Sequence, residues 1–305
     1  MKRFGNYQHV DGEPMNARDE QEVGSKFWNK GKWDNFVLPF ISDDCNDMTL
    51  VDMGCNAGVF LKLAEDKGFK KVIGIDANGE SLKKAIAYKE RNGGKYEIQR
   101  RHIERTIDHL PVADYTVLAN THYYFKINDW LDYLDKLQVK TRYCIIVTAE
   151  KRERLYNASA DTKDIKEYFK NWDYVGIIDD ISQDDPFPRN QWSLCFKSRF
   201  IDRVPTEGLI HDNTLQVNFY KELEEGIDPL KTEYYNDLKN YRNGSWTDEK
   251  LARFIIEKAN IFKDVRDSGL KKPIIINSDN KILDGIHRYE MMKYLGHKSV
   301  LVRIT

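Results

Sequence analysis

The chain has 305 residues, of which 41% are hydrophobic and 32% are charged, and its 48 basic and 49 acidic residues leave a formal net charge of −1. This near balance excludes a strong overall electrostatic field that would draw the protein to nucleic acid or to a membrane surface, although it does not exclude a local basic patch. A length of 305 residues predicts two domains, each able to bury a core of its own.

The cellular compartment follows from segments that the sequence lacks. The first residues, MKRFGNYQHVDGE, contain no apolar segment of a signal peptide, and no apolar run approaches the roughly 18 residues of a membrane span. The cysteines are widely spaced and form no CxxC pair, so we expect reduced thiols and predict no metal site. They are Cys45, Cys55, Cys144 and Cys195. We therefore expect a cytoplasmic protein without a membrane partner.

The N-terminal segment divides into an arm and a helix. Residues 1–24 are polar, with scattered glycines and a proline, and predict a loose N-terminal arm. Residues 25–41 carry aromatic side chains at intervals of three to four. This spacing predicts an amphipathic helix that is interrupted near Gly31 and ends before Pro39.

Residues 50–64, LVDMGCNAGVFLKLA, predict a strand, a tight turn and a helix. Gly54 and Gly58 lie in this turn, where the absence of a Cβ lets a ligand approach backbone N–H groups. At the carboxyl edge of a parallel sheet, such a turn forms a crevice for a nucleotide-like ligand. The next strand, 71–78, contains Asp76 about 20 residues after Gly54, where an acid can accept both hydroxyls of a ribose.

These residues resemble the first motif of the class I S-adenosylmethionine-dependent methyltransferases, acid-x-Gly-x-Gly-x-Gly, with an acid closing the second strand. Asp52, Gly54 and Gly58 match its outer positions. Asn56 stands where the middle glycine is commonest, a mild departure because Asn also tolerates unusual backbone angles. The resemblance implies S-adenosyl-L-methionine as cofactor and an α/β, Rossmann-like methyltransferase domain over residues 25–200, with a mostly parallel seven-stranded sheet.

The turn allows two alternative interpretations. A nicotinamide dinucleotide is the alternative cofactor, but Asn56 breaks the glycine pattern that its fingerprint needs. The glycines could also close a turn in an α/β fold without binding any ligand.

The following segments continue the pattern of alternating strands and helices. Residues 79–91 predict a helix, and residues 95–101 predict a third strand. The resemblance places His102 and Ile103, just past that strand, beside the adenine ring. A fourth strand is expected at 114–121.

Asn120, Thr121 and His122 lie at the carboxyl end of this fourth strand, where the family carries out its substrate chemistry. The paired prolines of amino-methylating enzymes and the Pro-Cys nucleophile of cytosine C5 enzymes are absent, which disfavours DNA base methylation. We expect a small-molecule or nucleotide-type acceptor. His122 could act as a general base, hydrogen-bond the substrate, or be structural, and a base is optional because positioning supplies most of the rate of methyl transfer.

The rest of the first domain predicts two helices and three strands, the last two matching the antiparallel sixth and seventh strands that close the methyltransferase sheet. These elements are the helices 130–137 and 165–172 and the strands 142–149, 174–179 and 191–198. The resemblance therefore ends near residue 200, which predicts a second domain over 201–305.

The second domain carries a motif of its own. After a predicted helix at 247–265, the run DSGLKKPIIINSDNKILDGIHRYEMMKYLGHKSVLVRI predicts a Pro-led strand, a hairpin, a helix and a last strand. This order resembles the ParB/sulfiredoxin-like superfamily, whose hairpin ends in acid-Gly-x-His-Arg at a helix N-terminus, here Asp284, Gly285, His287 and Arg288. The resemblance implies a smaller α+β domain that holds phosphate at this corner, because a helix N-terminus and an arginine both favour anions.

The chemistry of this corner is open between several members of the superfamily. Ile286 replaces the cysteine of sulfiredoxins, which excludes sulfinic acid reduction. Related small-molecule kinases share the form seen here, which implies ATP or ADP with Mg as a second ligand, whereas ParB proteins need a further DNA-binding domain that we do not expect. A purely structural alternative is an ion pair between Asp284 and Arg288 with His287 capping the helix.

Two functions of different classes follow. In the first, the protein methylates a small molecule or nucleotide and its second domain holds a phosphorylated substrate. In the second, the C-terminal domain is a nucleotide- or nucleic-acid-binding, ParB-type module with kinase-like chemistry as one form, and the methyltransferase fold is a scaffold. Charge does not indicate a nucleic-acid partner.

Overall fold

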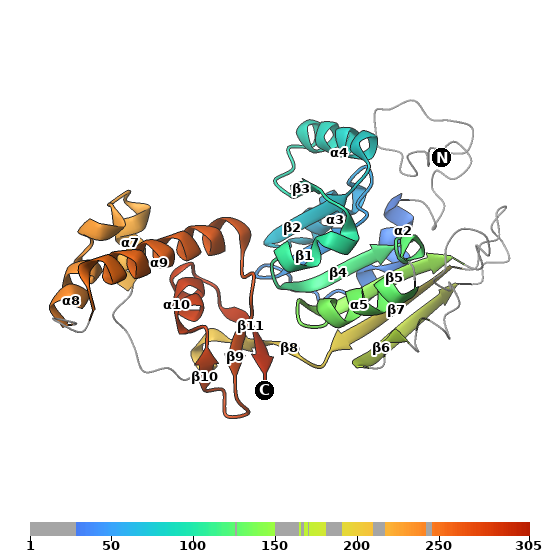
Figure 1. Cartoon of the computed structure of the whole chain (residues 1–305). Helices are drawn as coiled ribbons and strands as arrows, with labels where there is room; N and C mark the ends of the chain where they lie inside the picture. Colours follow the sequence, from blue (N-terminus) through green and yellow to red (C-terminus); the bar gives the residue numbers. More distant parts are fainter. Residues whose placement is uncertain are drawn as a thin grey trace. The chain divides into compact units, whose positions relative to one another are not determined.

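The computed structural model describes the following residues of the chain: 29–125, 127–149, 165, 168–169, 171–180, 191–209, 217–241 and 246–305. The chain forms two compact units, Met1–Ile201 and Asp202–Thr305 (Figure 1). The predicted arm at 1–24 and most of the predicted helix at 165–172 lie outside the described residues.

The N-terminal unit contains a seven-stranded sheet with the order β3-β2-β1-β4-β5-β7-β6 (Figure 1). Neighbouring strands from β3 to β5 are parallel, and β7 is antiparallel to both of its neighbours. The strands are β1 Thr49–Met53, β2 Lys71–Asp76, β3 Glu97–Arg100, β4 Ala113–Ala119, β5 Thr141–Ala149, β6 Trp172–Asp180 and β7 Gln191–Ser198. The predicted mostly parallel seven-stranded sheet is confirmed.

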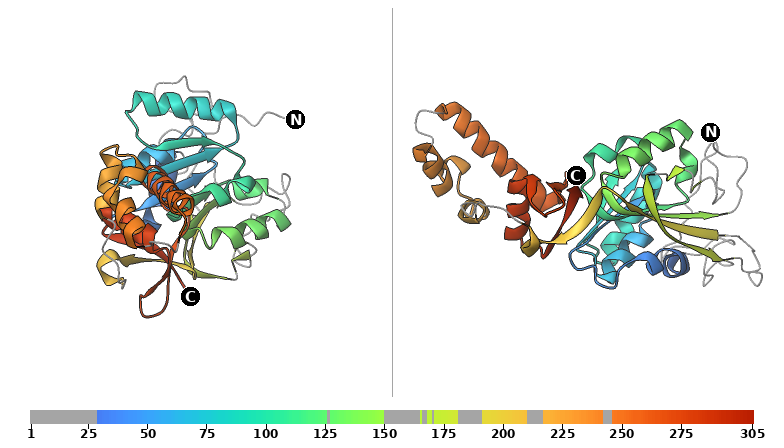
Figure 2. Two further views of the ribbon diagram at one scale, coloured as in Figure 1. Left: turned by 60° about the vertical axis from the view of Figure 1, so that its left-hand side comes forward. Right: turned by 90° about the horizontal axis from the view of Figure 1, so that it is seen from below.

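Helices cover both faces of this sheet (Figure 2), and its central strands β1 and β4 are therefore buried in nearly every position. One hydrophobic core joins the sheet to α2, α3 and α4, and a second core on the other face joins it to α5. These helices are α2 Asn29–Phe36, α3 Val59–Lys67, α4 Gly79–Arg91 and α5 Ile127–Leu137. The layered arrangement leaves the carboxyl ends of β1, β2, β3 and β4 at one edge of the sheet.

The predicted interruption near Gly31 is wrong, because α2 continues through this residue to Phe36. A glycine inside a helix costs about 1 kcal/mol relative to alanine. Trp33 and Phe36 are almost fully buried, and the burial of two aromatic side chains outweighs that cost. Asn35 also donates a side-chain hydrogen bond to the Gly31 carbonyl, one turn back. Several one-turn 3-10 helices were not predicted: Leu38–Phe40, Ile103–Arg105, Ile107–His109 and His122–Tyr124.

The C-terminal unit contains a four-stranded sheet with the order β10-β9-β11-β8. Its elements are the strands β8 Ile201–Pro205, β9 Ile274–Ile276, β10 Ile282–Asp284 and β11 Ser299–Ile304, the helices α7 Val217–Glu224, α8 Glu233–Tyr241, α9 Asp248–Ser268 and α10 Ile286–Tyr294, and the 3-10 turns Thr206–Gly208 and Pro229–Lys231. Thr247 caps the long helix α9, because its Oγ1 accepts a hydrogen bond from the Lys250 N–H at 3.2 Å.

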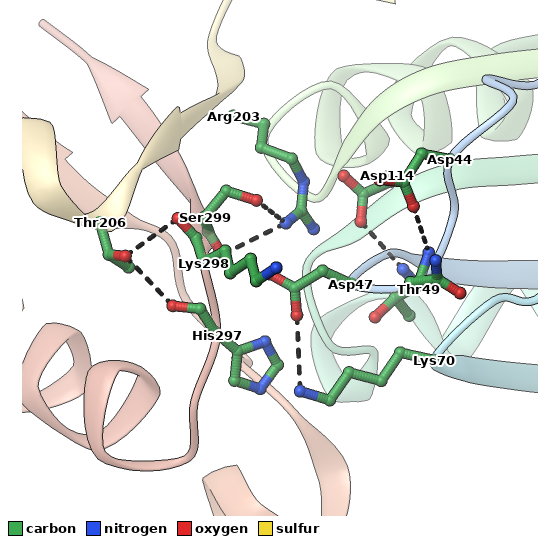
Figure 3. A network of polar contacts seen from close by, with 11 residues as sticks. Asp44, Asp47, Thr49, Lys70, Asp114, Arg203, Thr206, His297, Lys298 and Ser299 are labelled. Atoms are coloured by element: carbon green, nitrogen blue, oxygen red, sulfur yellow. Dashed lines mark hydrogen bonds and ion pairs between the residues drawn. The ribbon is translucent and has the colours of Figure 1, made fainter.

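Strand β8 was not predicted from the sequence. It is held beside β11 by side chains as well as by the backbone (Figure 3). Arg203 Nη1 donates to Ser299 Oγ over 2.7 Å, and the Thr206 hydroxyl lies 2.9 Å from the Lys298 carbonyl. These contacts fix the first strand of the unit against its last one.

Candidate functional site

The turn after β1 has a left-handed backbone at three positions. The φ angles are 83° at Gly54, 49° at Asn56 and 82° at Gly58. Gly54 N and Cys55 N both donate to the Ile75 carbonyl, at 2.7 and 3.0 Å, so the turn folds back against the end of β2. Glycine reaches such angles without strain, whereas Asn is one of the few other residues that tolerates them.

Asp76 lies at the end of β2, and backbone N–H groups from two different turns hold its carboxylate. Its Oδ2 accepts from Asn56 N at 2.9 Å, and its Oδ1 accepts from Asn78 N at 2.7 Å. Asn78 then caps α4 by accepting from the Glu80 and Ser81 N–H groups. Because each carboxylate oxygen has two lone pairs, both keep acceptor capacity for a ligand.

His102 and Ile103 follow β3, which is the neighbour of β2 in the sheet, and Asp76 is the last residue of β2. The Arg101 N–H donates to the Asp76 carbonyl at 3.0 Å, which places the start of this segment beside the end of β2. His102 is exposed and Ile103 is half-buried. The two predicted adenine-side residues therefore lie at the same edge of the sheet as Asp76.

Asp52 is set apart from the turn, inside β1, and its carboxyl group is almost fully buried. Burial and, to a lesser degree, the nearby Asp76 carboxylate raise the pKa of Asp52 to about 8. The side chain is therefore mostly protonated and uncharged at pH 7. A neutral acid at this position avoids placing a second negative charge next to Asp76.

Thr121 connects the end of β4 to the turn after β1. Its hydroxyl donates to the Met53 carbonyl at 2.7 Å. A Cβ on Gly54 would lie 2.8 Å from Thr121 Cγ2, so the two segments touch at a place where only glycine fits. This gives Thr121, predicted to face the acceptor, a structural contact within the protein.

His122 is buried, with only 1% of its surface exposed. Its Nε2 lies 3.4 Å from Thr148 Oγ1, and its ring centroid lies 6.2 Å from that of Trp130. Burial lowers the pKa of His122 to about 3, so the imidazole is neutral at pH 7 and is a weak base. Of the three roles considered for His122, this environment favours the structural one.

Asn56 and Asn120 share two unusual properties that the sequence did not reveal. Asn120, which follows β4, also has a left-handed backbone, with φ 56°. The side-chain Oδ1 atoms of both residues are buried, and neither has a hydrogen-bond partner within the part of the chain that the structure describes. A buried acceptor without a partner costs about 1–3 kcal/mol, so two of them at one sheet edge are unusual in a folded protein.

The predicted phosphate corner of the C-terminal unit lies where β10 meets α10. Gly285 caps α10 with φ 92°, and Arg288 Nη2 forms a 2.8 Å ion pair with Asp284 Oδ2. A Cβ on Gly285 would lie 2.8 Å from this same Nη2 atom, so the guanidinium packs directly on the glycine. The His287 ring centroid lies 6.1 Å from that of Phe254. The structure thus brings Asp284, Gly285 and Arg288 into contact, with Arg288 already paired to Asp284, whereas the His287 ring lies beside Phe254.

A cluster of buried titratable side chains lies inside the C-terminal unit, away from the predicted phosphate corner. Lys258 of α9 is 2% exposed, its Nζ is 3.0 Å from Tyr234 Oη, and it lies 4.2 Å from the centroid of the same ring. Burial lowers the pKa of Lys258 to about 7, against an opposing effect of Glu290, and burial raises the pKa of Glu290 to about 7. Lys258 follows Leu251 and Ile255 on the apolar stripe of α9, a spacing that could have indicated its burial.

The described ranges show neither a metal cluster nor a membrane span. None of them contains three or more His, Cys, Asp or Glu side chains grouped so that they could hold a metal ion. Among the helices described, none is long and apolar enough to cross a membrane.

Comparison with known proteins yields one short match in sequence. No model of a protein family matches the chain. The ribosomal protein L11 methyltransferase of Colwellia psychrerythraea (strain 34H / ATCC BAA-681) is 45% identical over 49 residues, which are 16% of this chain and 17% of that protein. The match therefore spans less than a fifth of either protein.

Solved structures with similar backbones include three proteins whose names contain methyltransferase. Magnesium protoporphyrin IX methyltransferase (ChlM) from Synechocystis PCC 6803 with bound SAM has a TM-score of 0.47 and 13% identity, covering 61% of this chain and 86% of that chain. N-methyltransferase NodS from Bradyrhizobium japonicum WM9 in complex with S-adenosyl-L-homocysteine has a TM-score of 0.42 and 14% identity, covering 50% of this chain and 78% of that chain. The bifunctional kinase-methyltransferase WbdD has a TM-score of 0.42 and 20% identity, covering 65% of this chain and 44% of that chain. These TM-scores are below 0.5, so the description of the fold rests on the strand order itself.

Proposed function

We propose that the N-terminal unit binds S-adenosyl-L-methionine and transfers its methyl group to a small-molecule or nucleotide-type acceptor. The observation that carries this proposal is the geometry around Asp76. Its carboxylate is oriented by N–H groups from the turns after β1 and β2 and retains acceptor capacity. A diol such as that of a ribose fits a carboxylate with this orientation.

The side chains at the sheet edge also fit the donor groups of this cofactor. It carries ribose hydroxyls, which are hydrogen-bond donors, and the edge offers the Asp76 carboxylate as their acceptor. Gly54 and Gly58 give the turn its left-handed backbone, and their missing side chains make room for Thr121 and Ala85. The proposal of this cofactor is supported by the match between its hydrogen-bond donors and the acceptors at the sheet edge, rather than by similarity to other structures.

We assign roles to the chain's residues on this basis. Asp76 would hold the ribose, and His102 and Ile103 would flank the adenine. When bound, the cofactor supplies a methyl group on a positively charged sulfur, which any correctly placed nucleophile can displace. Asn120 would position the acceptor by hydrogen bonding, while Thr121 and His122 would shape its surroundings, since orientation alone provides a large part of the acceleration in such a displacement.

Titration calorimetry with S-adenosyl-L-methionine tests this proposal. Micromolar binding by the full chain is expected, with loss in Asp76→Ala and no change in Asp132→Ala, which removes an exposed carboxylate of α5. The same variants are then assayed with methyl-labelled cofactor against nucleotides and small amines. Absence of binding by the unmodified chain, or equal binding by Asp76→Ala, would overturn the proposed function.

A second candidate function concerns the C-terminal unit, as a ParB/sulfiredoxin-like domain that binds a phosphate or nucleotide. The observation that favours it is the packing of the Arg288 guanidinium on Gly285 at the start of α10. An anion there would meet both the helix N-terminus and an arginine that is only 16% exposed. Arg288 would have to exchange Asp284 for the anion, with Mg accompanying ATP or ADP.

Titration of the full chain with ADP, and with ATP plus Mg, tests this second candidate. Arg288→Ala should abolish nucleotide binding, and the control Arg266→Ala, which removes an exposed arginine from the end of α9, should leave it intact. If nucleotide binds equally well without the Arg288 side chain, the corner is only a structural ion pair. If S-adenosyl-L-methionine does not bind while nucleotide does, the methyltransferase-like unit is a scaffold.

A further inference from the structure

Basic side chains gather at the β3 end of the seven-stranded sheet. Residues 83–105 contain eight lysines and arginines and three glutamates, an excess of positive charge in a chain whose 48 basic and 49 acidic residues nearly cancel. This stretch runs from α4 into β3, which is the outermost strand at its end of the sheet order, and continues to Arg105 (Figure 1). The charge balance of the whole chain therefore hides a local basic surface.

Five basic residues of this stretch are exposed and have no ion pair with any residue that the structure describes. We call them the basic row: Arg91, Lys95, Arg100, Arg101 and Arg105. Other exposed cations of the same unit do have acidic partners, since Lys136 and Arg199 each lie 2.7 Å from an aspartate oxygen. One of the three glutamates, Glu97, is itself paired with Lys71 at 2.9 Å. The positive charge of the basic row is thus not neutralised within the described part of the chain.

The basic row follows β3 toward the candidate site. Lys95 precedes this strand, Arg100 is its last residue, and Arg101 and Arg105 come after it. The Arg101 N–H donates to the Asp76 carbonyl at 3.0 Å, so this end of the row adjoins the edge where the cofactor is proposed to bind. A polyanion that lies along the row is therefore directed toward that edge.

An exposed aromatic ring lies farther along the same edge. Tyr124 ends the one-turn helix that follows β4, and 45% of its surface is exposed. Two strands, β2 and β1, separate β3 from β4, and neighbouring strands are about 4.8 Å apart, so the ends of β3 and β4 are about 14 Å apart. Successive phosphates of a stacked nucleic-acid strand are about 3.4 Å apart. The distance therefore suits a chain of about four nucleotides.

We infer that this edge of the N-terminal unit binds single-stranded nucleic acid, with the basic row on its phosphates and the Tyr124 ring on one of its bases. Arginine holds phosphate through two parallel hydrogen bonds, and an exposed aromatic ring stacks on a base that no duplex covers. An acidic peptide would pair with the arginines but would leave the ring unused. A membrane surface needs apolar side chains beside the charges, and Ile86 is the one exposed large hydrophobic residue described within 83–105.

This inference narrows the acceptor of the proposed function to a nucleotide within a strand, and it rests on that function for its chemistry. An oxygen or nitrogen of the bound strand would form a bond to the methyl carbon while the carbon–sulfur bond breaks and its electron pair stays on sulfur. The products are a methylated strand, S-adenosyl-L-homocysteine and one proton, which passes to water. Binding of the strand does not itself require the cofactor, so the surface and the chemistry can be tested separately.

Fluorescence anisotropy with a labelled 12-nucleotide single strand tests the surface, using RNA and DNA of one mixed sequence as probes. The full chain should bind at least one probe with micromolar affinity at low salt. Arg101→Ala and Arg105→Ala should each weaken binding and reduce the slope of log affinity against log salt by about 0.7, the value for one phosphate contact on a single strand. The matched control Arg199→Ala removes the same charge from the segment after β7 and should leave affinity and slope unchanged.

The Tyr124 ring is tested by a second pair of variants. Tyr124→Ala should weaken strand binding about 10-fold without changing the salt slope, because it removes one stacked base and no phosphate contact. Tyr124→Phe keeps the ring and should bind like the unmodified chain. Poly-L-glutamate of equal charge serves as a competitor and should displace the strand poorly, since it has no bases to stack.

Four results would overturn the inference. These are no binding of either probe, arginine variants that bind as tightly as Arg199→Ala, equal affinities of Tyr124→Ala and Tyr124→Phe, and displacement of the strand by poly-L-glutamate as effective as by unlabelled strand. Any one of them would show that the exposed charges and the ring do not form a surface for nucleic acid.

The failure of this inference can be told apart from failure of the proposed function by calorimetry with S-adenosyl-L-methionine. If the unmodified chain binds the cofactor but neither strand, the cofactor site stands and the nucleic-acid surface is wrong. If a strand binds in the expected pattern and the cofactor does not, the surface stands and methyl transfer is wrong. With methyl-labelled cofactor, label should appear on the bound strand, and binding of both without transfer would overturn the role of the strand as acceptor.

Discussion

The Thr121 hydroxyl donates to the Met53 carbonyl at 2.7 Å and so joins the last residue of β1 to the residue that follows β4 by two positions. The contact lies beneath Gly54, whose missing side chain makes room for the Thr121 methyl group. Two parallel strands are thereby locked at the edge where the ligand is proposed to bind. The geometry of the candidate site depends on this pair.

Removal of the Thr121 hydroxyl should loosen this edge. Thr121→Val keeps the shape but leaves the Met53 carbonyl without its donor, which should lower the free energy of unfolding by about 1–3 kcal/mol. Thr121→Ser keeps the hydroxyl and should cost less. Urea unfolding of the three proteins measures the difference, and equal losses in Val and Ser variants would show that the hydrogen bond contributes nothing.

A methyl group on Gly54 should be harmful for two reasons. Gly54→Ala combines a left-handed backbone with a contact of 2.8 Å to Thr121 Cγ2. Gly93→Ala is the matched control, since Gly93 also has a positive φ but no atom lies within 4 Å of its added Cβ. We expect about 1 kcal/mol for Gly93→Ala, from the backbone alone, and about 1–3 kcal/mol more for Gly54→Ala.

The two alanine variants are compared by urea denaturation followed by tryptophan fluorescence. A loss in Gly54→Ala no larger than that in Gly93→Ala would mean that Thr121 moves aside freely. In that case the close approach of the two turns would not constrain the site.

The pKa of Asp52 predicts an unusual dependence of stability on pH. Burial holds this pKa near 8 in the folded chain, well above the value of about 3.9 in an unfolded chain. Between these values the folded state binds more protons, so the contribution of Asp52 to the free energy of unfolding is lost as pH rises. Asp52→Asn should therefore gain stability relative to the unmodified chain as pH increases from about 4 to 8, with a slope of at most about 1.4 kcal/mol per pH unit.

Chemical denaturation at several pH values measures this difference. Asp66→Asn serves as control because Asp66 is an exposed carboxylate of α3. A buried neutral acid at position 52 is ruled out if the difference between Asp52→Asn and the unmodified chain is independent of pH.

Lys258 predicts the opposite sign in the C-terminal unit. Burial lowers its pKa to about 7, whereas an unfolded lysine has a pKa of about 10.4. The unfolded state binds more protons between these values, so the unit should become more stable as pH rises from about 7 to 10. Lys258→Met should remove this rise, and Lys263→Met, which replaces an exposed lysine of the same helix, should preserve it.

Urea unfolding followed by circular dichroism, repeated across this pH range, tests the role of Lys258. A rise of equal size in both methionine variants would assign the pH dependence to other groups. The comparison is informative because the two variants make the same replacement on one helix and differ in burial.

The sequence was sufficient to predict the strands and helices that bury much apolar surface. The strands β1, β2 and β4 are mainly apolar, and the turn at Gly54 and the acid at Asp76 mark where β1 and β2 end. β8 was missed because Ile201–Pro205 is short and mixes charged with apolar residues, so that only pairing with β11 makes it a strand. Residues with this character take their structure from their neighbours rather than from local preference.

The candidate site was predictable in position and less so in chemistry. Asp76 could be placed by its distance from Gly54, since the spacing of a strand–helix–strand unit fixes it. The burial of His122 and of the Asn56 and Asn120 oxygens depends on packing between segments far apart in the sequence. No periodicity or motif in one segment reports such packing, and for this reason only the structure shows that the two amide oxygens are buried.

The position of β7 between β5 and β6 has a consequence for the newly made chain. β6 is synthesised before β7, yet in the sheet it lies beyond β7, at the end of the strand order. While the ribosome is still making residues 191–198, both β5 and β6 lack the neighbour that later separates them. In the C-terminal unit, β11 is the last strand synthesised and lies between β9 and β8. Each sheet therefore closes late, by insertion of a strand into its interior, so a chain interrupted before either insertion would present unpaired edges to chaperones and proteases.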